Sequence, residues 1–225
     1  MSHTKVILFD SNETLVDLAA LDPHFARAFG DSTVRQAWFT QLLQLFLTAS
    51  VVDQYQSFET LADAALDMVA TVRGTDLRKP DRAAILEALL QLPPHPDVRP
   101  ALDQLKATNL RLAVLTNSTA KTARAQMKHA GLEDCFEVVL SADAVKRYKP
   151  SREAYAYAAK ELDVDLDEIR LVAAHGWDVT GALAAGCRAA FVGRPGKVLN
   201  PKGERPDIVG TTMGDVIAQI IHRDA

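Results

Sequence analysis

The sequence lacks the features that mark secreted scaffolds and nucleic-acid-binding proteins. Two cysteines in 225 residues, Cys135 and Cys187, are too few for a disulfide framework, so we expect a reducing compartment. Basic residues number 25 against 29 acidic ones, and the net charge of -4 offers no strong positive field for nucleic acid. Hydrophobic residues at 48% and charged residues at 24% are close to the globular average. A chain of this length buries roughly 70% of its unfolded surface, so it needs no disulfides or metal ions to be stable.

Long hydrophobic runs are also missing. No stretch approaches the roughly 18 apolar residues of a membrane span. The longest apolar region, near Leu42–Val52, is interrupted by Gln44 and Ser50. The N-terminus does not resemble a signal peptide, because the short apolar run Val6–Phe9 ends at Asp10. We therefore expect a soluble cytoplasmic protein with neither a membrane nor a nucleic acid as its partner.

Short continuous apolar runs, typical of strands covered on both faces, recur along the chain. They lie at Lys5–Phe9, Leu110–Leu115, Phe136–Leu140, Ile169–Ala174, Ala189–Val192 and, more weakly, Asp207–Val209. Helical patterns separate them, at Val98–Ala107, Ala120–Ala130, Ser151–Leu162, Val179–Ala185 and Met213–Ile221. This alternation predicts an α/β fold, in which a doubly wound parallel sheet carries helices on both faces.

Residues 18–92 break the alternation, because they contain helical periodicity and almost no strand signal. Val34–Phe46, Ser57–Thr71 and Asp81–Gln91 each have the pattern of an amphipathic helix. Pro93 and Pro94 mark the end of the segment. We therefore predict a core domain of residues 1–17 and 93–225, with a helical domain of residues 18–92 inserted after the first strand.

Polar motifs follow four of the predicted strands. In an open parallel sheet, ligands bind at the edge where the strands have their carboxyl ends. The motifs are Phe9–Leu15 (FDSNETL), Leu115–Ser118 (LTNS), Tyr148–Pro150 (YKP) and His175–Asp178 (HGWD). Their common position predicts that they form one site at that edge.

Taken together and in this order, the motifs resemble those of the haloacid dehalogenase superfamily. The pattern is a hydrophobic strand followed by Asp-x-x-x-Thr, then a strand followed by Thr/Ser-Asn, then Lys-Pro, then Asp. The resemblance covers essentially the whole chain, including the helical segment after the first motif. It implies a Rossmann-like core with an inserted α-helical cap.

The resemblance implies roles for four residues. Asp10 would be the nucleophile, and a carboxylate suits that role because it is already ionised at neutral pH. Lys149 would stabilise the negative charge of Asp10 and position its carboxylate. Thr14 and Thr116 would bind the nucleophile or the substrate, although both are equally compatible with turn or capping roles.

Two departures point away from phosphoryl transfer. Phosphatases of the superfamily have a second aspartate two residues after the nucleophile, where this chain has Asn12. An amide cannot act as a general acid, and losing that group typically costs about 10²–10⁴ in rate. The phosphatases also have a magnesium-binding aspartate four residues before the fourth-motif aspartate, where this chain has Ala174. Asp10 and Asp178 remain, so weak magnesium binding stays open.

The departures favour the 2-haloacid dehalogenase branch, which is metal-independent, and we expect no cofactor. In that branch the aspartate displaces halide from the α-carbon of a short 2-haloacid, and water hydrolyses the resulting ester to a 2-hydroxy acid. Halide needs no proton to leave, so Asn12 at the substrate-binding site is no handicap.

The branch resemblance extends to further residues. Asn117 would cradle the halide, Tyr155 matches a branch tyrosine that binds substrate, and Asp178 would orient or deprotonate the hydrolytic water. Trp177 would wall the pocket or serve as a core aromatic. His175 would hydrogen-bond to Asp178, activate water or bind substrate, unless it is a structural histidine.

Glu13 and Phe39 depart from the family pattern. Glu13 replaces a glycine, and we expect its side chain to face solvent, because an unpaired carboxylate beside Asp10 would be repelled. The usual cap arginine, which helps to bind the departing halide, falls on Phe39. Arg35, one turn earlier on the same predicted helix, is its candidate substitute.

Two other functions remain open at this point. One is a magnesium-dependent phosphatase with altered motifs, and the other is a catalytically silent relative that only binds a ligand. Relatives often pair through cap helices, and the apolar segment Trp38–Leu47 is compatible with a homodimer of this kind.

Overall fold

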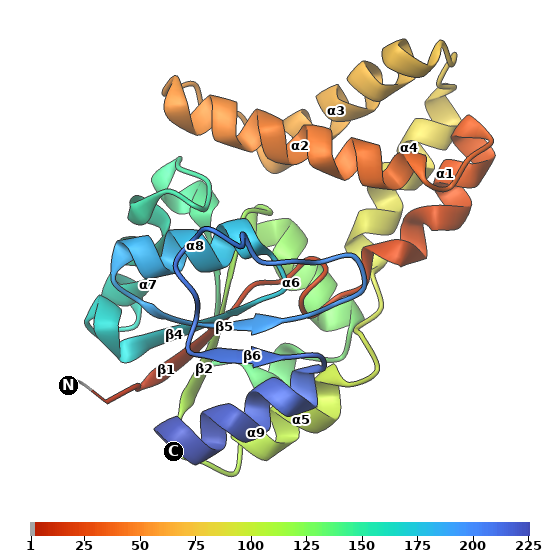
Figure 1. The fold of residues 1–225 in the computed structure, drawn as a ribbon. Coiled ribbons are helices and arrows are strands. Elements are labelled where there is room, and N and C mark those ends of the chain that lie inside the picture. Colours follow the sequence, from red (N-terminus) through yellow and green to blue (C-terminus); the bar gives the residue numbers. More distant parts are fainter. Residues whose placement is uncertain (1–2) are drawn as a thin grey trace.

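The apolar runs form one parallel sheet of six strands in the computed structural model, which describes residues 3–225 (Figure 1). The strands are β1 (Val6–Phe9), β2 (Arg111–Thr116), β3 (Val138–Ser141), β4 (Ile169–Ala173), β5 (Arg188–Val192) and β6 (Ile208–Gly210). Their order is β3-β2-β1-β4-β5-β6. Since β1 lies between β2 and β4, the chain reverses its direction of winding there, which confirms the doubly wound α/β prediction.

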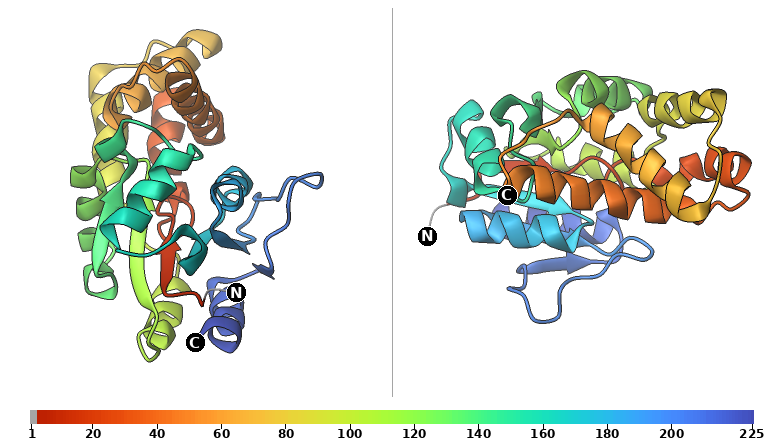
Figure 2. Two further views of the ribbon diagram at one scale, coloured as in Figure 1. Left: turned by 90° about the vertical axis from the view of Figure 1, so that its left-hand side faces the viewer. Right: turned by 90° about the horizontal axis from the view of Figure 1, so that it is seen from above.

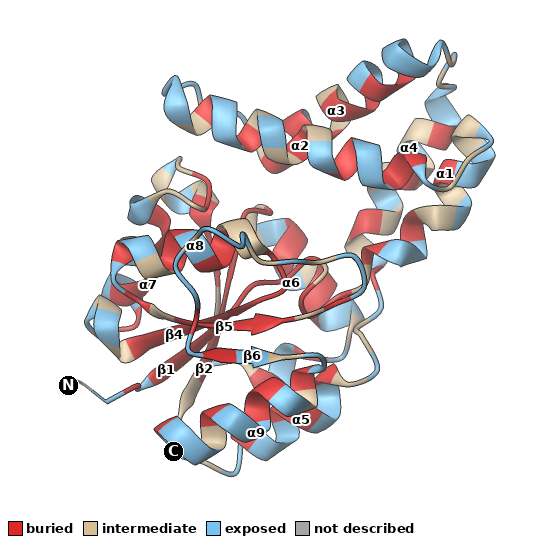
Figure 3. Cartoon of the chain, viewed as in Figure 1, coloured by how far each residue is buried: buried red, intermediate tan, exposed pale blue. Residues whose placement is uncertain are grey.

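Helices cover both faces of the sheet, because alternate residues of each strand point to opposite sides. Ile7 and Phe9 pack with α5 (Val98–Leu105), α6 (Ala120–His129) and α9 (Met213–Asp224). Val6 and Leu8 pack with α7 (Arg152–Glu161) and α8 (Gly176–Ala185). The strands are accordingly buried almost throughout (Figure 3).

The segment between β1 and α5 is helical. It consists of η1 (Leu18–Leu21), α1 (Asp22–Phe29), α2 (Val34–Val51), α3 (Phe58–Arg73), α4 (Lys79–Ala88) and η2 (Leu89–Gln91). Figure 2 shows α1–α4, in orange and yellow, gathered at one end of the molecule. The chain leaves and re-enters the core side by side, since Asp17 N donates to Pro93 O at 2.8 Å and His95 N donates to Leu15 O at 3.0 Å. The domain limits at 17 and 93 stay a prediction that this geometry supports.

The helices of this segment differ from the prediction in two respects. Helix α1 was not predicted; it begins with Pro23 in its first turn and buries Phe25 alone. Helix α2 runs to Val51 and is not amphipathic, because apolar side chains continue on its outer face, where Leu47 is 46% and Val51 84% exposed. Among residues 3–225, no helix is both long enough and apolar enough to span a bilayer.

Helix α8 is the element that brings the fourth motif to the sheet edge. It begins at Gly176, three residues before the predicted start, so that Asp178 lies in its first turn. Gly181 allows α8 to approach the third motif closely. A Cβ atom on Gly181 would lie 2.4 Å from Pro150 Cβ and 2.6 Å from the Tyr155 hydroxyl. The position of Asp178 therefore depends on a glycine one turn further along its helix.

We predict that Gly181→Ala destabilises the protein by about 1–3 kcal/mol, because overpacking outweighs the gain of about 1 kcal/mol in helix propensity. Chemical denaturation measures the free energy of unfolding. Gly214→Ala, in the first turn of helix α9, is the matched control, since the atom nearest to its Cβ would be Thr212 Oγ1 at 3.8 Å. Equal effects of the two substitutions would contradict the close packing of α8.

Candidate active site

Asp10 follows the last residue of β1 and is 5% exposed, at the carboxyl edge of the sheet. The loop after it turns back at once, and Leu15 N donates to Ser11 O at 2.8 Å. This turn lets Thr14 Oγ1 donate to Asp10 Oδ2 at 2.7 Å and accept from Ala174 N at 2.9 Å, beyond the end of β4. Thr14 therefore contacts the predicted nucleophile and ties its loop to the neighbouring strand.

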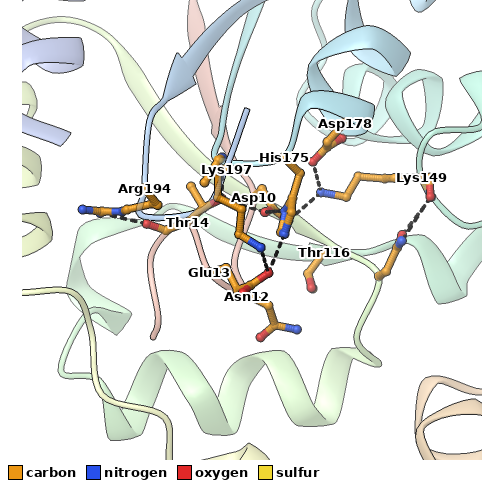
Figure 4. A network of polar contacts seen from close by, with 12 residues as sticks. Asp10, Asn12, Glu13, Thr14, Thr116, Lys149, His175, Asp178, Arg194 and Lys197 are labelled. Carbon is orange, nitrogen blue, oxygen red and sulfur yellow. Dashed lines mark hydrogen bonds and ion pairs between the residues drawn. The ribbon is translucent and has the colours of Figure 1, made fainter. Parts of the chain in front are cut away.

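Lys149 lies at the centre of the site (Figure 4). Its ammonium group donates to Asp10 Oδ1 at 2.9 Å, to Leu115 O at 2.8 Å and to Asp178 Oδ2 at 2.6 Å. Burial would lower the pKa of Lys149, but the negative charges of Asp10 and Asp178 hold it above its usual value. Lys149 is thus a fixed cation that joins the first, second and fourth motifs.

Asp178 and Tyr155 form a buried hydrogen-bonded pair next to Lys149. The Tyr155 hydroxyl donates to Asp178 Oδ1 at 2.5 Å, and neither side chain has exposed surface. Burial is the main reason that the pKa of Asp178 is raised, against the opposing effect of Lys149. Tyr155 was predicted to bind substrate, yet this geometry favours a role in positioning Asp178.

Asn117 and Thr116 hold the loops of the site. The Asn117 side chain accepts from Lys149 N at 2.8 Å and donates to Lys149 O at 3.1 Å, so it fixes the backbone of the lysine. Thr116 Oγ1 accepts from Ser118 N at 3.1 Å, the turn-type contact that was one of its two expected roles. Their proposed contacts with substrate or halide stay predictions.

His175 bridges two carboxylates. Its Nδ1 lies 3.0 Å from Asp10 Oδ2, and its Nε2 lies 2.9 Å from Glu13 Oε2. Burial opposes protonation, but the hydrogen bonds and charges of Asp10 and Glu13 raise the pKa of His175 to about 9. Three active roles were expected of this histidine: a hydrogen bond to Asp178, activation of water and binding of substrate. The geometry does not provide the first of these.

Glu13 faces the site, and the expectation that it faces solvent is wrong. Its side chain is 13% exposed and pairs with both His175 and Lys197, while Arg35 Nη1 lies 3.8 Å from Glu13 Oε1. Burial would raise the pKa of Glu13, yet His175 and Lys197 hold it below its usual value. The repulsion from Asp10 that we anticipated is removed because His175 lies between the two carboxylates.

The same partners keep Asp10 ionised. Burial by itself would raise the pKa of this carboxyl group, but the charge of Lys149, followed by the hydrogen bond and charge of His175, holds it well below its usual range. An ionised, hydrogen-bonded carboxylate at the sheet edge has the state that a nucleophile requires.

Asn12 points away from Asp10, toward α6 (Figure 4). Its amide nitrogen donates to Ser118 Oγ at 3.3 Å, and its oxygen accepts from Gln126 Nε2 at 3.1 Å. Gln126 also donates to Leu89 O at 2.8 Å and so joins the first motif to the helical segment. The first motif is therefore anchored at the position where the phosphatases have their second aspartate.

Two cavities flank His175 and Glu13. A cavity of about 700 Å³ is lined by His175 and Trp177, whose rings stack at 5.1 Å, and by Lys197. A second cavity, of about 300 Å³, is lined by Glu13, Phe39, Lys197 and other residues of α2 and the loop after β5. The Phe39 ring lies 5.8 Å from His175, so the residue at the position of the cap arginine does reach the site.

Sequence reasoning missed Lys197, which lies in the loop between β5 and β6. The available signal was a basic residue in a Gly-Arg-Pro-Gly-Lys stretch directly after a strand end. In the described part of the chain, residues 3–225, no three His, Cys, Asp or Glu side chains are grouped so as to hold a metal ion.

The raised pKa of His175 predicts a pH-dependent stability. Because the folded-state pKa of about 9 exceeds the ordinary value of 6.5, protonation of His175 stabilises the fold fully below pH 6.5. We expect about 3 kcal/mol of the free energy of unfolding to be lost as pH rises from 6.5 to 9. Urea denaturation across this range should reveal the slope in the wild type and a flatter one in His175→Gln. His129→Gln, at an exposed position, should retain the wild-type slope.

Comparison with known proteins places this site in a family. The family model for haloacid dehalogenase-like hydrolases matches residues 4–186. An (S)-2-haloacid dehalogenase of Pseudomonas sp. (strain YL) is 31% identical, over 96% of this chain and 94% of the relative. Haloacetate dehalogenase H-2 of Moraxella sp. (strain B) is 27% identical, over 98% of this chain and 99% of the relative.

A solved structure agrees in fold across the full length. The L-2-haloacid dehalogenase of Xanthobacter autotrophicus with chloropropionic acid covalently bound has a TM-score of 0.90 and 25% identity, and covers 99% of this chain and 100% of its own. The match of the family model, the full-length relatives and the Asp10–Lys149–Asp178 geometry agree: the chain belongs to the haloacid dehalogenase-like hydrolase family.

Proposed function

We propose that the protein is a metal-independent dehalogenase that hydrolyses short 2-haloacids, such as a haloacetate or an (S)-2-haloalkanoate, to 2-hydroxy acids. The observation that carries the proposal is the ionised carboxylate of Asp10, held by Lys149, Thr14 and His175, of which His175 also lines the larger cavity. The substrates in the names of the relatives support the choice of haloacids, and the covalently bound acid in the Xanthobacter protein supports an ester intermediate.

In the first step, Asp10 attacks the α-carbon of the haloacid. A carbon–oxygen bond to Asp10 forms, the carbon–halogen bond breaks, and the halide leaves with the bonding electrons. The step consumes no proton, so it has no use for a general acid at Asn12. Lys149 fixes Asp10 Oδ1, while Thr14 and His175 both contact Oδ2, so the carboxylate is oriented before attack.

In the second step, we assign the activation of water to His175, supported by Glu13. Esterification removes the charge of Asp10, one of the two carboxylates that raise the pKa of His175. The pKa of His175 then falls, and the imidazole releases its proton to solvent. Neutral His175 takes a proton from water as the oxygen attacks the ester carbonyl carbon. It then protonates the departing alkoxide, and the regenerated Asp10 carboxyl group returns a proton to His175. The sum is haloacid plus water giving hydroxy acid, halide and one proton.

Asp178 is less suited to be the base, although the family pattern suggests it. Its two carboxylate oxygens already accept from Lys149 at 2.6 Å and from Tyr155 at 2.5 Å, and the side chain has no exposed surface. We propose that Asp178 positions Lys149.

Neither alternative function has support of its own. A phosphatase would need an acid where the Asn12 amide is bound by Ser118 and Gln126, and a magnesium ligand where the chain has Ala174. A silent binding protein would have no chemical need for the intact Asp10–Lys149–Asp178 array.

We further propose that residues 18–92 act as a cap, since Arg35 and Phe39 of α2 line the smaller cavity. The exposed Leu47 and Val51 of the same helix support pairing of two chains through the cap. The unpaired thiols Cys135 and Cys187 support a cytoplasmic location.

We predict halide release from chloroacetate or one enantiomer of 2-chloropropionate, unchanged by EDTA and absent in Asp10→Asn. Fluoroacetate in the same panel determines whether the carbon–fluorine bond is also cleaved. An ion-selective electrode measures the halide. Phosphate ester hydrolysis that appears only with magnesium, without halide release, would favour the phosphatase instead.

The assignment of the base predicts which variants accumulate the ester. In His175→Gln and Glu13→Gln, a first turnover of halide should be followed by slow turnover, reduced about 10²–10⁴-fold in His175→Gln, where the base itself is lost. Mass spectrometry of the peptide that contains Asp10 detects the ester. Asp178→Asn should instead slow the first halide release, because Lys149 loses a partner. Ester accumulation in Asp178→Asn alone would assign the base to Asp178.

A further inference from the structure

The proposed reaction brings two anionic groups into a buried site. The substrate carries a carboxylate, and the first step generates a halide. An anion without a partner in apolar surroundings is costly. The site therefore needs a cation with hydrogen-bond donors that are not already used by the protein.

Two of the cations at the site have no donors left. The ammonium group of Lys149 has three N–H donors, and these are directed at Asp10, Leu115 O and Asp178. Both ring nitrogens of His175 are engaged, by Asp10 and by Glu13.

The two arginines nearby are less well placed to serve both cavities. Arg35 Nε donates to Asp22 and its Nη1 lies 3.8 Å from Glu13, so Arg35 keeps free donors, but it lines the smaller cavity and not the larger one. Arg194 Nη1 binds Asp97, and its Nη2 donates to Thr14 O at 3.0 Å, behind the first motif.

Lys197 combines free donors with a position at both cavities. Its ammonium group has one carboxylate partner, Glu13, so two of its three donors have no protein acceptor among residues 3–225. The side chain is 22% exposed, and the residue lines both cavities. Its Nζ lies 5.6 Å from the centre of the Phe39 ring, at the face that the helical segment presents to the site.

Glu13 does not need Lys197 exclusively, because His175 and Arg35 also lie against its carboxylate. An anion can therefore share Lys197 with Glu13 or replace it there without leaving Glu13 unpaired. The loop that carries Lys197 belongs to the core, and Gly196 adopts a left-handed φ of 75° immediately before it.

We propose that Lys197 binds an anionic group of the reacting molecule, either its carboxylate or the departing halide, at the junction of the two cavities. The inference rests on the proposed function for the identity of the molecule. The geometry of Lys197 requires only that the ligand is a small anion.

Binding without turnover tests the inference separately from the reaction. Sodium bromide supplies the halide and sodium propionate supplies the carboxylate, each titrated into the full-length protein by calorimetry. We expect at least one of them to bind the wild type, and Lys197→Met to bind it about 10- to 100-fold more weakly, as for loss of a charge-assisted hydrogen bond. Lys197→Arg should retain most of the affinity. Lys202→Met, at an exposed lysine of the same loop, is the matched control.

Kinetics distinguish the two anions. If Lys197 binds the carboxylate, Lys197→Met raises KM by a similar factor for chloro- and bromo-substrates. If it binds the halide, kcat falls more for chloride than for bromide, the better leaving group. A wild type that binds neither anion, or a Lys197→Met variant equal to it in binding, KM and kcat, would overturn the inference. Anion binding that depends on Lys197, without halide release from any haloacid, would instead leave the inference standing and refute the proposed function.

Discussion

The site depends on the buried ammonium group of Lys149. A charge removed from water is tolerated only when its partners are close and complete. Here Asp10 comes from the end of β1, Leu115 O from β2 and Asp178 from the first turn of α8, so one nitrogen joins three elements of the core. Loss of that cation would leave two buried carboxylates facing each other. The other contacts build on this arrangement: Tyr155 fixes Asp178, and Thr14 fixes Asp10.

The central part of this arrangement could be predicted from the sequence. Asp10 and Asp178 follow apolar runs, and parallel strands bring the residues after their carboxyl ends to one edge. A strand pattern is local, so it can be recognised without knowledge of the rest of the chain. Lys149 follows no strand directly, and its position was implied by the resemblance of the Lys-Pro motif to the family pattern.

The surroundings of Glu13 could not be predicted, because they depend on contacts across the chain. The expectation of a solvent-facing side chain assumed that Glu13 has no partner. Its partners, His175 and Lys197, lie 162 and 184 residues further along the chain. Whether the loop after β5 turns toward β1 is decided by packing, not by local pattern. Helix α1 escaped prediction for a different reason: it is only eight residues long, and its pattern reduces to Phe25 and Phe29 one turn apart.

The charges of the site explain why a glutamate is compatible with the position next to a nucleophile. Asp10, Glu13 and Asp178 are balanced by Lys149, Lys197 and a protonated His175. Esterification of Asp10 removes one negative charge and leaves the array with an excess of positive charge. That excess lowers the affinity of His175 for its proton at the stage when a base is needed, and it attracts the halide at the stage when the halide must be held. All six of these charges come from the core, and the helical segment adds one more charge near them, Arg35, 3.8 Å from Glu13. Its other contact there is the uncharged Phe39, so movement of that segment would leave the six core charges in place.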